Sequence, residues 1–112
     1  MSVYIREVIE GQIVEYLMKE AIKEVLEIDY NAEKMSNGYL LKGWHGPISY
    51  EIKNKVLEYY VDSWGKTQEW EKIKANIHNL YVAKVYETAL LKAGWKNISK
   101  TKSGDKIRIY AR

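Results

Sequence analysis

Apolar side chains recur every three or four positions through residues 3–27, which predicts one long amphipathic helix. Ile9, Ile13 and Leu17 follow one another at four-residue steps, and glutamates and lysines occupy the opposite side. This spacing gathers apolar side chains into a stripe along one side of a helix. The stripe is wide for a single buried face, so we expect two elements of the domain, or alternatively a second copy of the chain, to cover it.

Alternating residues on both sides of a tight-turn sequence predict a β-hairpin in the middle of the chain. Ser36-Asn37-Gly38 supplies residue types that tolerate a positive φ, as a two-residue hairpin turn requires. The predicted strands cover about 27–33 and 38–44.

Helical spacing returns after Pro47 and predicts three further helices. Pro47 suits the first turn of a helix, where its missing N–H group is not needed. Gly65 and Gly94 are typical of helix ends, and Thr67 is a candidate N-cap. The predicted helices cover, in order, residues 48–64, 68–77 and 80–93.

Alternating basic and apolar residues close the chain and predict a second β-hairpin over residues 96–112. Lys106 and Arg108 fall on one face of its second strand, whereas Ile107 and Ile109 fall on the other. We expect the apolar face to cover the core, which leaves the basic face for a partner.

Charge is divided unequally between the two parts of the chain. Residues 66–112 contain eleven of the 18 lysines and arginines and four of the 15 acidic residues, a net charge of +7. Residues 1–65 contain the remaining seven and eleven, a net charge of −4. A strongly basic part favours a polyanionic partner such as nucleic acid.

Composition indicates one soluble domain and gives little sign of catalysis. The 112 residues suffice for a single core, so we expect one α+β domain over residues 1–112 without a membrane span. The absence of cysteine excludes disulfides and thiolate metal sites and fits a reducing, cytoplasmic environment. His45 and His78 lie far apart in sequence, and no metal or phosphate-loop motif is present. We therefore expect no enzyme, no metal and no cofactor.

From Pro47 onward, the order helix, helix, short turn, helix, hairpin resembles the winged-helix family of DNA-binding domains. The resemblance is carried by "VLEYY" ahead of Gly65, then "TQEWEKIKANI", "LYVAKVYETALLKAGW" and "KNISKTKSGDKIRIYAR". It implies a helix-plus-hairpin extension over 1–46 and a three-helix winged-helix-like unit over 47–112.

The resemblance implies a recognition helix near 80–93 and a basic wing over 96–112. Val82, Tyr86 and Ala89 fall where such a helix points into the core. Side chains at the start of the helix would meet base edges, and cations of the wing would contact phosphates. The implied nucleic-acid-binding residues are His78, Asn79, Tyr81, Lys84, Lys96, Lys100, Lys102, Lys106, Arg108 and Arg112.

Two hypotheses of function follow. The first is a small DNA-binding regulator, of the kind encoded by viruses or mobile elements, that binds double-stranded DNA and can form a homodimer. The alternative is a protein-binding inhibitor or adaptor, of the viral anti-defence type, that acts on a host protein through an aromatic or charged surface. A basic surface shared by the hairpin and residues 78–84 favours DNA, whereas an exposed aromatic patch elsewhere favours a protein partner.

Overall fold

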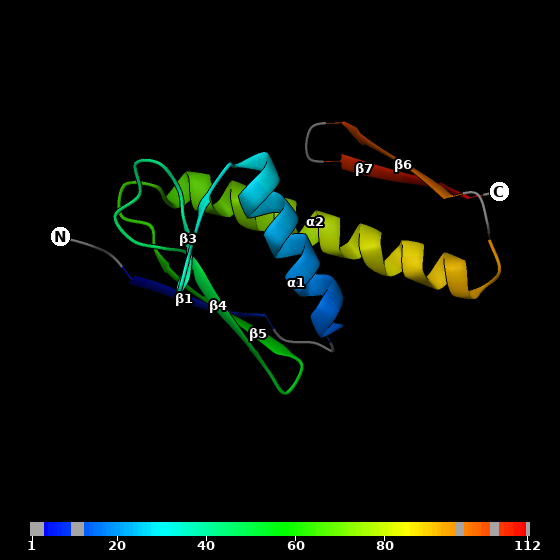
Figure 1. Cartoon of the computed structure of the whole chain (residues 1–112), viewed down its shortest axis with the longest axis horizontal. Helices are drawn as coiled ribbons and strands as arrows, with labels where there is room; N and C mark the ends of the chain where they lie inside the picture. Colours follow the sequence, from blue (N-terminus) through cyan, green and yellow to red (C-terminus); the bar gives the residue numbers. More distant parts are fainter. Residues whose placement is uncertain (1–3, 10–12, 96–97, 104–105, 112) are drawn as a thin grey trace.

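The computed structural model describes the backbone of residues 4–9, 13–95, 98–103 and 106–111, and the side chains of residues 13–95, 108 and 109. The fold is α+β, as the sequence predicts (Figure 1). The elements are, in chain order, β1 (Tyr4–Ile9), α1 (Glu15–Lys23), the π-helical segment η1 (Glu24–Asp29), β2 (Glu33–Met35), β3 (Gly38–Leu40), β4 (Ser49–Lys53), β5 (Val56–Asp62), α2 (Thr67–Lys92), β6 (Ile98–Ser103) and β7 (Lys106–Ala111). The prediction of a three-helix unit over 47–112 is wrong, because α2 is the only helix in the described part of that region.

A three-stranded antiparallel sheet replaces the predicted helix 48–64. Strand β5 lies between β1 and β4, and Leu57, Tyr59 and Val61 of β5 are fully buried. A four-residue spacing is also a multiple of two, so it keeps apolar residues on one face of a strand as well as on one side of a helix. Asn54 and Lys55 have φ of 54° and 61° and form the tight turn between β4 and β5.

The predicted helix 3–27 is wrong in its first part. Residues 4–9 form the edge strand β1, which pairs with β5, and the helix begins only at Glu15. Ile13 is buried ahead of the helix, and its N–H donates to the carbonyl of Lys55 at 3.3 Å. The apolar stripe of this segment is therefore shared between a strand, a connection and a helix.

Helix α1 continues without interruption into η1, whose wider turn keeps neighbouring apolar residues on the inner side. Val25 and Leu26 are adjacent in sequence and both fully buried. The N–H of Tyr30 donates to the carbonyl of Val25 five residues earlier, at 3.1 Å. In contrast, Ile28 projects outward and is 74% exposed.

The predicted turn and second strand of the central hairpin are confirmed, but the first strand predicted over 27–33 is wrong, because residues 24–29 form η1 and β2 covers only Glu33–Met35. Strands β2 and β3 pair across the turn at Ser36-Asn37. Tyr39 of β3 exchanges two backbone hydrogen bonds with Ile48, of 2.9 and 2.7 Å. Ile48 directly precedes β4, so these bonds join the central hairpin to the three-stranded sheet. Gly38 permits this approach, because a Cβ atom there would lie 2.3 Å from the carbonyl oxygen of Ile48.

A single helix of 26 residues, α2, replaces the two predicted helices 68–77 and 80–93. The sequence between them, at His78 and Asn79, contains neither glycine nor proline, so nothing interrupts the helical hydrogen bonds. The helix-turn-helix arrangement implied by the resemblance is therefore not formed in this described segment. Gly94, with φ of 93°, ends the helix as predicted, and the N–H of Trp95 donates to the carbonyl of Leu90 at 3.1 Å.

The C-terminal hairpin is confirmed as strands β6 and β7. Figure 1 shows α1 packed against α2, and the hairpin beside the C-terminal half of α2, where β7 contacts the helix. The main core lies between α1, the sheet and the first half of α2. Its fully buried members from α2 are Trp70, Ile73 and Ile77.

We predict that Gly38→Ala lowers the free energy of unfolding by at least about 2 kcal/mol, because its φ of 145° and the Ile48 carbonyl both exclude a Cβ atom. Urea denaturation measures this change. Gly46→Ala is the matched control, since a Cβ atom there would lie at an ordinary 3.6 Å from the Cβ of Asp62. Equal stability of the two variants would contradict the close β3–Ile48 contact.

Candidate interaction surface

The outer face of α2 is an apolar surface that the rest of the described chain leaves open. We define it by residues that recur at three- and four-residue steps and are all exposed: Ala75, Asn79, Val82, Tyr86, Ala89 and Ala93. Val82 is 49% and Tyr86 is 62% exposed. No charged residue interrupts this face from position 75 to position 93. It is a neutral strip about 27 Å long.

The expectation that Val82, Tyr86 and Ala89 point into the core is wrong. Helix α2 carries apolar residues on two opposite sides, so helical periodicity alone does not decide which side is buried. The inner side is fixed by Trp70 and Ile73, which are larger and fully buried. The remaining apolar side is then directed to solvent.

Contacts with Val14, α1 and η1 hold the inner side of α2 in place. The backbone N–H of Val14 donates to the hydroxyl oxygen of Tyr81 at 3.0 Å. The Nζ of Lys84 lies 2.9 Å from Glu24 Oε1 and 3.7 Å from Glu20 Oε2. The Lys84 side chain is only 10% exposed, so these two carboxylates compensate a nearly buried charge.

The four residues proposed to read bases at the start of the recognition helix do not lie on one surface. His78 stacks on the buried Tyr59 with ring centroids 6.4 Å apart. Tyr81 and Lys84 are engaged with α1 and η1, and only Asn79 lies on the outer face. The structure thus brings Tyr81 and Lys84 together with the N-terminal helix.

The proposed wing residues are described only in part. Lys96 and Arg112 lie outside the described residues, and the side chains of Lys100, Lys102 and Lys106 do as well. Arg108 is exposed.

The strand register defines which positions of the hairpin lie opposite each other. Position 100 pairs with 109 and position 102 with 107, whereas 101 pairs with 108 and 103 with 106. The predicted separation of Lys106 and Arg108 from Ile107 and Ile109 concerns the second strand alone. It stays a prediction, because the side chains of Lys106 and Ile107 lie outside the described residues.

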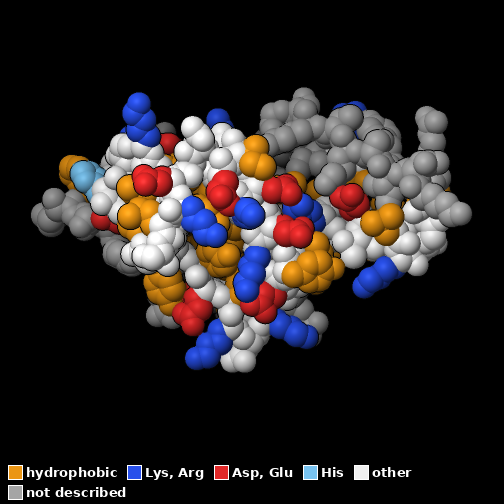
Figure 2. Space-filling view, in the orientation of Figure 1, with side chains coloured by type: hydrophobic (Ala, Val, Ile, Leu, Met, Phe, Trp, Pro, Cys, Tyr) orange, Lys and Arg blue, Asp and Glu red, His pale blue; other side chains and the backbone are white. Residues whose placement is uncertain are grey.

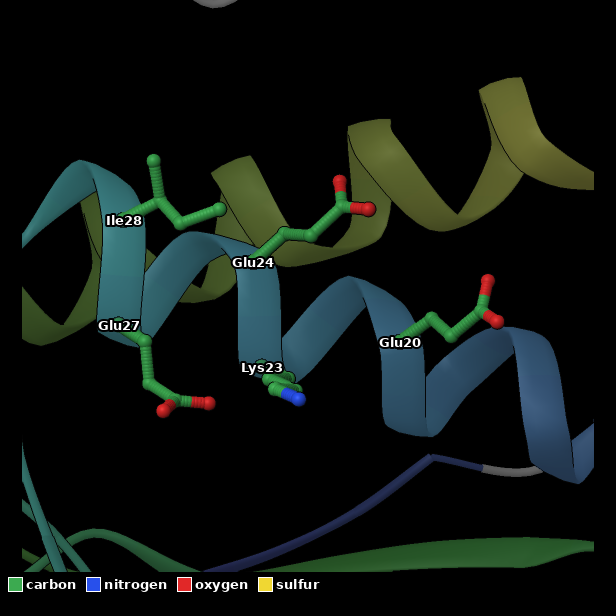
Figure 3. Close-up of a pocket in the computed structure, with 5 residues that line it drawn as sticks. All are labelled: Glu20, Lys23, Glu24, Glu27 and Ile28. Carbon is green, nitrogen blue, oxygen red and sulfur yellow. The ribbon is translucent and has the colours of Figure 1, made fainter.

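The exposed side of α1 and η1 forms an acidic hollow of about 380 Å³. Its lining residues are Glu20, Lys23, Glu24, Glu27 and Ile28 (Figure 3). Glu20 and Glu24 project on the side next to α2, and Glu27 accepts a hydrogen bond of 3.4 Å from the hydroxyl of Tyr39. Burial, followed by the charge of Glu27, raises the pKa of Tyr39. All three carboxylates therefore already contact side chains of this chain: Glu20 and Glu24 contact Lys84, and Glu27 contacts Tyr39.

Charges of both signs alternate over the face that shows α1. Figure 2 shows red and blue side chains interspersed there, without a patch of one sign among the described residues of this view. Among residues with described positions, no group of three or more histidine, aspartate or glutamate side chains could hold a metal ion. Within that same part of the chain, no helix is long and apolar enough to cross a membrane. The outer face of α2 differs from these features because its row of exposed side chains carries no charge.

We predict that replacing both Lys84 partners, Glu20→Gln with Glu24→Gln, lowers the free energy of unfolding by about 2 kcal/mol, because a nearly buried charge loses its compensation. The loss falls below that of a fully buried pair because both carboxylates are half exposed and screened by water. Lys84→Met is the matched control and costs less than about 1 kcal/mol, since it removes the charge itself. A larger loss for Lys84→Met, measured by urea denaturation, would contradict this account.

In comparisons with known proteins, no family model, no curated protein and no solved structure matches this chain. Its function therefore has to be argued from its own surfaces.

Proposed function

We propose that this chain is a non-enzymatic protein-binding module, an adaptor or inhibitor, that acts through the outer face of α2. The observation that carries the proposal is the row of exposed, uncharged side chains from Ala75 to Ala93 on the outside of a helix whose inside is already buried. A row of exposed apolar side chains on a helix is a candidate contact for another polypeptide. Helix α1, η1 and β7 contact α2 and leave this row exposed, so a second polypeptide would cover it.

The chemistry of the outer face fits an apolar helix better than a nucleic acid. Val82 and Tyr86 provide a central aliphatic and aromatic contact, and tyrosine is among the residue types that most often dominate binding energy. The alanines at both ends let another backbone approach closely. A phosphate backbone would find no cation on this face, whereas nucleic-acid affinity depends on lysines and arginines.

Nucleic-acid binding by the C-terminal hairpin is the second candidate function. Residues 96–112 contain six lysines and arginines against one acidic residue, and Arg108 is exposed on strand β7. Two-stranded ribbons also enter DNA grooves without a recognition helix. This candidate keeps the predicted basic hairpin but assigns no role to His78, Tyr81 or Lys84.

For the protein-binding proposal, we predict that a photo-reactive phenylalanine analogue at position 86 gives a discrete covalent adduct with another polypeptide in the native cell. The same analogue at position 16 is the matched control, because Tyr16 is also an exposed tyrosine, 58% exposed, but lies on α1. The position 86 adduct should disappear when Val82→Glu is added. An absence of adducts at position 86, or equal adducts at both positions, would contradict the proposal.

For the second candidate, we predict that a labelled mixed-sequence duplex binds with micromolar affinity at about 50 mM salt and much more weakly at about 200 mM. Fluorescence anisotropy measures both. Arg108→Glu should weaken binding, while Lys84→Met, which changes a charge paired inside the fold, should not. A duplex that does not bind at low salt would remove this candidate and leave the protein-binding proposal intact.

A further inference from the structure

We draw no further inference here: the strongest candidate, the uncharged outer face of α2 from Ala75 to Ala93, belongs to the site already described, and nothing in the structure shows what covers it.

Discussion

The fold depends on the burial of one side of α2 against the sheet and α1. Trp70, Ile73 and Ile77 are fully shielded from water there, and each buried side chain of this size contributes about 2 kcal/mol relative to exposure. Strand β5 lies opposite with its own fully buried row, and the ring of Tyr59 meets Trp70 edge to face with centroids 5.1 Å apart. The other elements are arranged around this contact.

The same burial determines what the second half of α2 can do. Once the first turns are held by the sheet, the helix continues past α1, where Lys84 and Tyr81 fix its rotation through polar contacts. That rotation turns Val82 and Tyr86 outward. The outer face of α2 is therefore a consequence of the core, because the inner residues decide which apolar row remains exposed.

Local patterns in the sequence predicted those features that local chemistry determines. The α+β class, the turn at Ser36-Asn37, the helix end at Gly94 and the C-terminal hairpin all depend on nearby residues, and the structure confirms them. The helix predicted over 48–64 failed because its spacing also suits a strand. The predicted break near His78 failed because no residue there ends a helix.

The candidate site could not be predicted from the sequence, for a different physical reason. Val82 and Tyr86 were recognised as one row of a helix, but their direction depends on which of two apolar rows the distant Trp70 and Ile73 bring to the core. The ion pairs of Lys84 join residues 60 or more positions apart in sequence, so local patterns could not predict its burial either. A second apolar row on α2, without charges from 75 to 93, was the signal that could have indicated a helix covered on both sides. The most direct test of that claim compares the rate of thiol alkylation of Val82→Cys in intact native cells with the rate in the purified full chain. The account predicts slower alkylation in cells, where a partner covers this position, whereas equal rates would contradict it.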